Sequence, residues 1–500
     1  MSSSIAEFSA FHQHQFDLLT GFAISDSLFQ EDCVRTVQAF AQSADNLQDV
    51  FEASHQAQRL IRLHMAGLEN NANFRAALVE LNIPSWKDFE SVDVDASMQE
   101  SLARKLYQVK KPESDIFTFE VGDKSKLVAE YILKFAKQDG VEFSYAVRDP
   151  DFMTLVLNHC DGKGAKIMTD YLIAPALVAN RRAIAYPLMP EEILVEAAEG
   201  KNDNQEILRA GMKAVRERSG RGEAITTLTF LPTRAEAAID QIPYADYNRL
   251  FFEMCDQPWQ QISDAQKFLI EQFNKASHAR FTNDWGTDIE RELIDEKGRL
   301  FTFCNSLIDK NVPGSEIFSA PRRDSVNGRI VSRGRFHNDD SKIIENLRLH
   351  FTNGCLDTWG AEKGLEHFTR FIEHDEGNRY IGELGIGTNP HLKQHVSNGL
   401  LVEKIGGSFH LALGSAYTMT DYMGAPVYVD NGNRSKDHWD ITTMLYGAGG
   451  CIYLDGKKIM ENGSFLDERL DVLNRGWAAV PVLERSEYWR THSTPFRLER

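Results

Sequence analysis

Two imidazoles, two carboxylates and a phenol fall within one stretch of the chain, between residues 383 and 440. They belong to Glu383, His410, Tyr417, His438 and Asp440. Neutral imidazole binds zinc, cobalt, iron and manganese, and carboxylates bind the same divalent ions. No cysteine lies in this stretch. The set therefore predicts hydrolytic or redox metal chemistry and excludes a zinc finger built from cysteines.

The spacing of these residues fits a shared centre. His438 and Asp440 are separated by one residue, and alternate residues of a strand point to the same face. His410 precedes Tyr417 by seven residues, so a short strand followed by a turn at Gly414 returns the phenol toward the imidazole. We therefore expect these four side chains to approach one another.

Each residue alone also has a simpler explanation. The chain contains 15 histidines, and a single histidine more often packs in a core or faces water than binds a metal. Tyr417 alone is best explained as a packing residue, because a buried phenol needs one hydrogen-bond partner. Glu383 stands among glycines in IGELGIGTNP, where a ligand or other backbone can come close. The combination carries the metal hypothesis.

Four segments resemble, in the same order, those of the aminopeptidase T and aminopeptidase S family of metallo-aminopeptidases. They are GSEIFSAP (314–321), GELGIGTNP (382–390), SFHLALGSAY (408–417) and NRSKDHWD (433–440). The resemblance extends over roughly residues 280–470. It implies a metallo-aminopeptidase that acts on peptide substrates and forms a homodimer.

The resemblance also implies six metal ligands. Carried over by position, they are Glu316, Glu383, His410, Tyr417, His438 and Asp440. Glu316 is found through the resemblance alone, because its surroundings in the sequence indicate a Pro/Gly turn followed by a short apolar strand. Glu316 and Glu383 are both candidates for the catalytic general base.

This ligand set favours two divalent ions, zinc or cobalt, with magnesium and manganese also compatible. Two such ions bring a charge of about +4, which three carboxylates and one bridging hydroxide largely neutralise. Two ions roughly 3.5–4 Å apart can activate a shared water and polarise a scissile carbonyl. The expected activity is hydrolysis of N-terminal residues from peptides.

Two alternatives use the same residues differently. His410, His438 and Asp440 alone form a two-histidine, one-carboxylate set suited to mononuclear Fe(II), and ring-cleaving dihydroxypyridine dioxygenases look like relatives with such a set. A mononuclear iron site gives no role to Glu316, Glu383 and Tyr417. The other alternative is a non-catalytic scaffold that retains the fold.

The composition of the chain indicates its number of domains, its partners and its location. The chain has 500 residues, of which 42% are hydrophobic, so we expect a sizeable core and two or three domains. A net charge of −18 argues against a nucleic-acid partner. The sequence contains no apolar stretch of membrane-spanning length, so no membrane partner is expected. Six cysteines without C-x-x-C spacing, and an N-terminus unlike a secretory signal, predict a cytoplasmic enzyme.

Three regions differ in their patterns, and together they predict a chain of mixed α/β and α+β class. Residues 1–112 show apolar residues at helical spacing and form a predicted helical N-terminal extension. Residues 113–276 alternate between strand-like and helix-like segments, which predicts an α/β domain with a mostly parallel sheet. Residues 277–500 are strand-rich and form the predicted C-terminal metal-binding catalytic domain, which contains all six proposed ligands.

Overall fold

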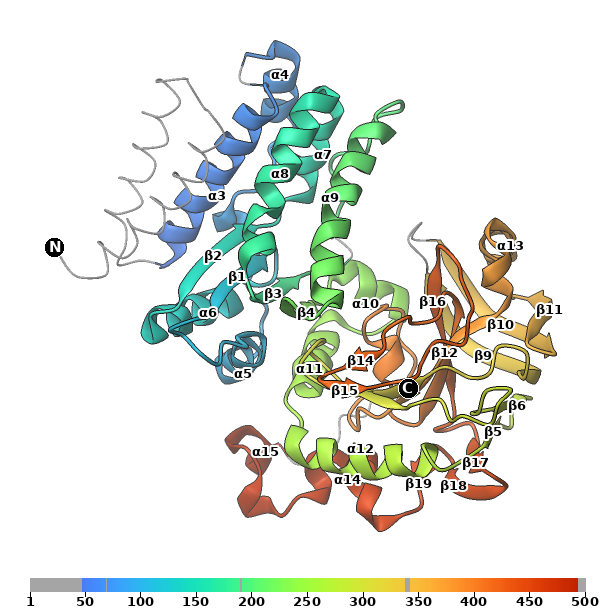
Figure 1. Ribbon diagram of the computed structural model, residues 1–500. Helices are drawn as coiled ribbons and strands as arrows, with labels where there is room; N and C mark the ends of the chain where they lie inside the picture. Colours follow the sequence, from blue (N-terminus) through green and yellow to red (C-terminus); the bar gives the residue numbers. More distant parts are fainter. Residues whose placement is uncertain (1–46, 69, 189–190, 338–341, 493–500) are drawn as a thin grey trace. The chain divides into compact units, whose positions relative to one another are not determined.

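The computed structural model describes residues 47–68, 70–188, 191–337 and 342–492 (Figure 1). The first part of the predicted helical extension, residues 1–46, lies outside them. The chain divides into two compact units, Met1–Ala235 and Glu236–Arg500. Within the described ranges, none of the helices combines the length and apolar character that crossing a membrane requires.

The first unit is built around a parallel sheet with the strand order β2-β1-β3-β4. Its strands are β1 (Ile116–Val121), β2 (Glu142–Val147), β3 (Arg181–Tyr186) and β4 (Ile225–Phe230). Its helices are α3 (Leu47–Met65), α4 (Ala72–Leu81), α5 (Ala96–Leu106), α6 (Lys126–Asp139), α7 (Pro150–His159), α8 (Gly162–Val178) and α9 (Asn202–Gly220). The predicted α/β alternation is confirmed (Figure 1).

Local sequence signals explain several of these helix ends. Asp149 caps α7 by accepting a hydrogen bond from the Phe152 amide, and Pro150 stands in the first turn, where its missing N–H costs nothing. Gly140 ends α6 in the left-handed conformation that glycine adopts without strain. The string DP at 149–150 is thus a start signal for α7.

The second unit contains two larger sheets. The eight-stranded sheet has the order β11-β10-β9-β6-β5-β17-β18-β19, and the five-stranded sheet has the order β16-β13-β12-β8-β7. The strands of the first are β5 (His278–Thr282), β6 (Asp288–Glu292), β9 (Asn327–His337), β10 (Ile343–Thr352), β11 (Cys355–Gly360), β17 (Cys451–Leu454), β18 (Lys457–Glu461) and β19 (Ser464–Phe465). Those of the second are β7 (Cys304–Ser306), β8 (Glu316–Ser319), β12 (Ile381–Gly387), β13 (Ser408–Gly414) and β16 (His438–Met444).

Helices and a short hairpin complete this unit. The hairpin pairs β14 (Asp421–Tyr422) with β15 (Ala425–Pro426). The helices are α11 (Tyr244–Cys255), α12 (Trp259–Phe273), α13 (Leu365–His374), α14 (Asp471–Arg475) and α15 (Glu487–Thr491), and α10 (Arg234–Asp240) spans the boundary between the two units. The predicted class, mixed α/β and α+β with a strand-rich C-terminal part, is confirmed.

The core of the second unit lies between its two sheets. Phe281 of β5 and Phe409 of β13 meet with their ring centroids 4.5 Å apart. Helix α12 adds Ile262, Leu269 and Phe273 to the same buried cluster. Burial of such side chains is the main favourable term in folding, so this cluster stabilises both sheets together.

The division into three predicted domains, 1–112, 113–276 and 277–500, stays a prediction. The boundary between the two compact units falls between residues 235 and 236. Helix α12, which the predicted boundary at 276 assigns to the middle domain, packs in the core of the second unit. In the first unit, Phe74 of α4 shares a buried cluster with residues of α7 and α8, so this helix has no core of its own.

One charged residue lies inside the core of the second unit without a polar partner. Arg291 of β6 is 1% exposed, and none of its three guanidinium nitrogens has a hydrogen-bond partner in the described part of the chain. Its guanidinium lies 4.6 Å from the ring centroid of Phe281 and 5.7 Å from that of Phe409. Burial lowers the pKa of Arg291 to about 9. The two aromatic rings offset only part of the cost of burying this charge.

We predict that Arg291→Met leaves the free energy of unfolding unchanged or raises it by about 1–4 kcal/mol, because a buried charge is replaced by an apolar side chain of similar length. Arg291→Ala removes packing volume as well and should be less stable than Arg291→Met by about 2–5 kcal/mol. Denaturant unfolding of both variants checks this. A methionine variant markedly less stable than the parent would show that the charge itself stabilises the fold.

Candidate metal centre

Four neighbouring strands of the five-stranded sheet carry five of the six predicted ligands. β8 begins with Glu316, β12 carries Glu383, β13 carries His410, and β16 carries His438 and Asp440. These strands are adjacent in the order β16-β13-β12-β8. Sheet topology thus collects residues that are up to 124 positions apart in the sequence, from 316 to 440.

The strand register places these side chains on one face of the sheet. Glu316 pairs with Gly387, which lies four residues after Glu383 on β12. His410 pairs with Gly385, and Asp440 pairs with Ala412, two residues beyond His410 on β13. Residues paired directly across antiparallel strands point to the same face, as do alternate residues of one strand.

The opposite face of the same strands is apolar. Leu384 and Ile386 alternate with Glu383 along β12, and Phe409 and Leu411 flank His410 on β13; all four apolar side chains are buried in the core of the second unit. A slip of one residue would turn them out of the core. Core packing therefore fixes which face carries the polar groups.

The polar groups lie close enough to share metal ions. His410 Nε2 is 3.4 Å from a Glu316 oxygen, 3.7 Å from Glu383 Oε1 and 3.9 Å from Asp440 Oδ1. His438 Nε2 is 3.1 Å from Glu383 Oε2 and 3.7 Å from Asp440 Oδ2. Each imidazole thus lies near a different oxygen of Glu383.

The potential ligand atoms form two groups that share one residue. Glu316, Glu383 and His410 make up one, and Glu383, His438 and Asp440 make up the other; within each group the ligand atoms lie within 4.8 Å of one another. Each group combines imidazole nitrogen with carboxylate oxygen, the donor set of divalent zinc, cobalt and manganese.

Buried polar atoms without partners converge at the same place. Glu316 Oε2, both ring nitrogens of His410 and Asp440 Oδ1 are buried and have no hydrogen-bond partner among the described residues. Buried polar atoms are almost always satisfied, so several such atoms facing one another need an explanation. Divalent cations would satisfy Glu316 Oε2, His410 Nε2 and Asp440 Oδ1, so these residues fit a metal; Nδ1 of His410 points in another direction and is not part of this set.

The electrostatics of the metal-free centre also indicate a site for a cation. Burial alone would lower the pKa of both histidines, but the neighbouring carboxylates raise it to about 9 for His410 and to about 10 for His438. Burial opposes ionisation of Glu383, yet the two imidazoles hold its pKa below the usual range. At neutral pH protons therefore occupy the imidazole positions that would hold metal.

A neighbouring carbonyl fixes the orientation of His438. Its Nδ1 lies 2.8 Å from the Ser415 carbonyl oxygen. A carbonyl accepts a hydrogen bond, so Nδ1 carries the proton and Nε2 is directed at Glu383 and Asp440.

Tyr417, the sixth predicted ligand, lies next to His438. It is half-buried, and its ring centroid is 5.7 Å from that of His438 and 5.3 Å from that of Phe318. Burial, together with the charges of Glu383 and Asp440, raises the pKa of its phenol well above the ordinary value. The turn after Gly414 thus brings the phenol near His438, and its predicted approach to His410 and its role as a ligand stay predictions.

Two charged residues of the site escaped the sequence analysis. Lys404 Nζ is fully buried and lies 2.6 Å from Glu316 Oε1 and 2.6 Å from Glu403 Oε2. Both residues belong to a short 3-10 helix, Val402–Lys404. Burial would lower the pKa of Lys404, but the two carboxylates raise it above its ordinary value. An adjacent Glu-Lys pair in a sequence is typical of a solvated surface, so no local signal indicated this role.

A buried hydrogen-bond network supports the backbone at Glu316. Gln266 Nε2 of α12 approaches three acceptors: Ser315 Oγ at 2.9 Å, the Glu316 carbonyl oxygen at 3.2 Å and Thr388 Oγ1 at 2.8 Å. Thr388 follows β12, so the network ties α12 to the ends of two strands of the site. Buried networks of this kind restrict the positions of the groups they join.

Gly385 leaves the space that the His410 ring occupies. A Cβ atom at this position would overlap the imidazole. We predict that Gly385→Ala displaces His410 and weakens zinc or cobalt binding by at least about tenfold, since one ligand of a shared centre is lost. Isothermal titration of metal into the metal-free protein checks this. Gly360→Ala is the matched control, because a Cβ there meets no atom within 4 Å. Equal affinities in the two variants would contradict the prediction.

Comparisons with known proteins agree with the predicted resemblance. The chain matches the family described as thermophilic metalloprotease (M29) over residues 195–465. Aminopeptidase AmpS of Bacillus subtilis (strain 168) is 37% identical over 168 residues, which are 31% of this chain and 40% of that protein. Aminopeptidase T of Thermus aquaticus is 28% identical over 212 residues, 40% of this chain and 49% of that protein. The matched segments thus span about half or less of these relatives' length.

A solved structure shares the fold. Wild-type AmpT from Thermus thermophilus superposes with a TM-score of 0.59 at 18% sequence identity, covering 74% of this chain and 99% of that chain. The family match spans more than half of the present chain and includes all six predicted ligands. The chain belongs to the thermophilic metalloprotease (M29) family.

Proposed function

We propose that this protein is a metal-dependent aminopeptidase that removes N-terminal residues from peptides with a water activated by two divalent ions. The observation that carries the proposal is the pair of ligand groups that share Glu383. The names of the relatives, aminopeptidase T and aminopeptidase AmpS, support the reaction.

In this proposal Glu316, Glu383 and His410 hold one ion, and Glu383, His438 and Asp440 hold the other. Bound divalent ions supply an acidified water and polarise a carbonyl. Lys404 keeps one oxygen of Glu316 in place and leaves the other directed at His410. Zinc or cobalt suits these ligands best, with magnesium or manganese as further candidates.

The mononuclear iron alternative fits the geometry less well. It uses His410, His438 and Asp440 and gives no role to Glu316 and Glu383. Both of these carboxylates are buried, and each has an oxygen within 3.4 Å of an imidazole nitrogen. A non-catalytic scaffold is also less well supported, because all six residues of the predicted ligand set are retained.

Glu403 is the general base in this proposal. Glu316 and Glu383, the two earlier candidates, both belong to the ligand groups, whereas Glu403 belongs to neither. Its side chain is 23% exposed and is therefore in contact with solvent. Burial opposes ionisation, but Lys404 and His410 lower the pKa of Glu403, which keeps its carboxylate ionised and so without a proton at neutral pH.

Metal content and activity test the shared-ligand assignment. We expect about two ions per chain in the parent protein, about one in Glu316→Ala and almost none in Glu383→Ala, because only Glu383 belongs to both groups. Chelation should abolish release of an N-terminal residue from a peptide, and added Co²⁺ or Zn²⁺ should restore it.

His350→Ala is the matched control for these ligand variants, since His350 forms a surface pair with Asp357 at 2.8 Å. Activity that persists in chelator, or one iron per chain without peptide cleavage, would refute the proposal. Equal metal loss in the Glu316 and Glu383 variants would refute the sharing of Glu383.

A second test concerns the proton acceptor. We predict that Glu403→Gln lowers kcat by about 10²–10⁴-fold while the metal content stays at the parent value, because a general base contributes a factor of this size. Glu373→Gln changes an exposed glutamate of α13 and serves as the control. If Glu403→Gln retained kcat, or lost metal instead, the base would have to be another residue.

The homodimer, the cytoplasmic location and the identity of the peptide substrates stay predictions from the sequence. Size-exclusion chromatography with light scattering addresses the first of them.

A further inference from the structure

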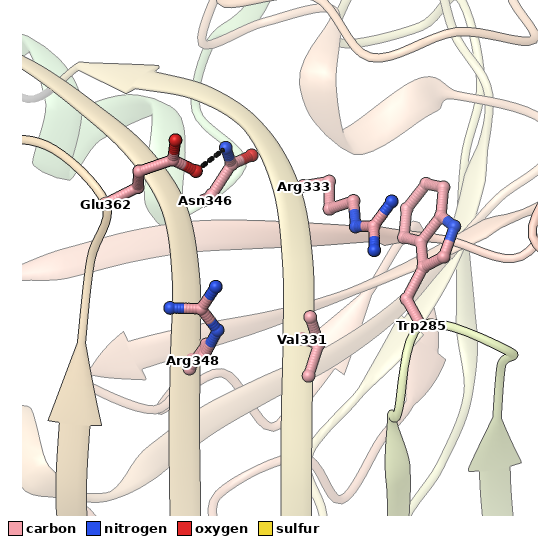
Figure 2. A pocket seen from close by; sticks show the side chains of 6 residues that line it. All are labelled: Trp285, Val331, Arg333, Asn346, Arg348 and Glu362. Carbon is pink, nitrogen blue, oxygen red and sulfur yellow. Dashed lines mark hydrogen bonds between the residues drawn. The ribbon is translucent and has the colours of Figure 1, made fainter.

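A pocket of the second unit lies on the eight-stranded sheet, whereas the metal centre lies on the five-stranded sheet; Figure 2 shows the pocket. It has a volume of about 350 Å³ and is lined by Trp285, Val331, Arg333, Asn346, Arg348 and Glu362. Along β9 and β10 its lining residues alternate with core residues that are at most 3% exposed, among them Ser332 and Leu347. The pocket therefore opens on the side of the sheet that faces away from the core.

Hydrogen bonds hold the wall that carries Trp285. The Thr287 hydroxyl and the Val331 backbone exchange two hydrogen bonds, at 3.0 and 3.2 Å, which dock the turn between β5 and β6 onto β9. Asn283 Oδ1 accepts hydrogen bonds from the amides of Trp285 and Thr287 at 3.1 and 3.0 Å. The indole is thus part of a fixed turn.

The opposite wall is equally well defined. Asn346 stands at an irregularity of β10 with a φ of 53°, and its side chain accepts a hydrogen bond from the Gly334 amide at 3.1 Å. The same side chain donates to Glu362 Oε2 at 2.7 Å (Figure 2). The second carboxylate oxygen of Glu362 makes no hydrogen bond with a residue that the structure describes.

Two arginines give this pocket an excess of positive charge. Arg333 lies against Trp285 with its guanidinium carbon 5.0 Å from the ring centroid, and Arg348 stands opposite Val331 (Figure 2). Neither guanidinium makes a hydrogen bond or an ion pair with any residue in the described ranges. Three other exposed arginines of this unit do have carboxylate partners at 2.7 Å: Arg280 with Asp288, Arg434 with Asp430, and Arg469 with Asp467.

We propose that this pocket binds a small molecule with carboxylate groups, and that a dicarboxylic amino acid matches its charges best. Two guanidinium groups present paired N–H donors to two carboxylates, and Glu362 can accept from an ammonium group. The volume is sufficient for an amino acid or a short acidic peptide. In a protein with a net charge of −18, two arginines that have no carboxylate partner among the described residues form a local site of attraction for anions.

Binding of L-glutamate to the full-length metal-loaded protein tests this proposal by calorimetric titration. We expect saturable binding that weakens by at least about tenfold in Arg333→Gln and in Arg348→Gln, since each substitution removes a charge-assisted hydrogen bond. Arg329→Gln is the matched control, because Arg329 is exposed on the same face of β9 but does not line the pocket.

Further probes identify the source and the place of binding. An acidic tripeptide that binds more tightly than L-glutamate would make a peptide the ligand, whereas tighter L-glutamate would make it the free amino acid; either supports the pocket. Binding should persist in His438→Ala, which alters the metal centre. Loss of binding in that variant, equal affinity for inorganic phosphate, or no binding of either carboxylate probe would overturn the proposal.

Discussion

The alternation of side chains along β12 and β13 is the constraint on which the rest of the site depends. Leu384 and Phe409 face the core, and this directs Glu383 and His410 to the opposite face. Because the side-chain period of a strand is two, the hydrophobic free energy of the core is also what holds the polar residues in register. A ligand on a central strand is therefore positioned by the apolar residues beside it in the sequence.

Glycine completes this arrangement where the strands would otherwise be too crowded. His410 pairs with Gly385, so its ring lies over β12 where a larger residue would stand. The same space allows one imidazole to approach carboxylates from three strands, those of Glu316, Glu383 and Asp440. Gly385, in the string GELGIG, is thus needed because it has no side chain and leaves room for the His410 ring, and not because the chain turns or is flexible there.

The sequence indicated much of the site and less of its surroundings. The types and spacing of Glu383, His410, His438 and Asp440 were sufficient to predict a common centre, since each lies in a short segment of strand character. Glu316 required the family resemblance, because one glutamate after a Pro/Gly turn has no chemical signature. Lys404 could not be predicted, because its burial arises from contacts with Glu316, 88 positions away.

The need for tertiary contacts also explains why the predicted domain boundary at residue 276 differs from the boundary between the two compact units. The strand pattern begins near residue 277, and the predicted boundary followed it. The apolar face of α12 is equally compatible with either neighbouring domain, and only the tertiary structure shows that Leu269 packs in the second unit. Local periodicity predicts that a helix has a buried face, but it does not identify the core that receives that face.

Lys404 and Arg291 are two buried cations of the second unit whose pKa values are shifted in opposite directions. Burial lowers the pKa of Arg291 to about 9, and the carboxylates of Glu316 and Glu403 overcome the same effect at Lys404. A buried cation that is paired on two sides is held in one position, because any movement separates it from both partners at once. Arg291, held by aromatic rings alone, lacks that directional restraint. The cation that is held in one position is thus the one at the metal centre. There Lys404 fixes the carboxylate of Glu316, a proposed ligand, relative to that of Glu403, the proposed base.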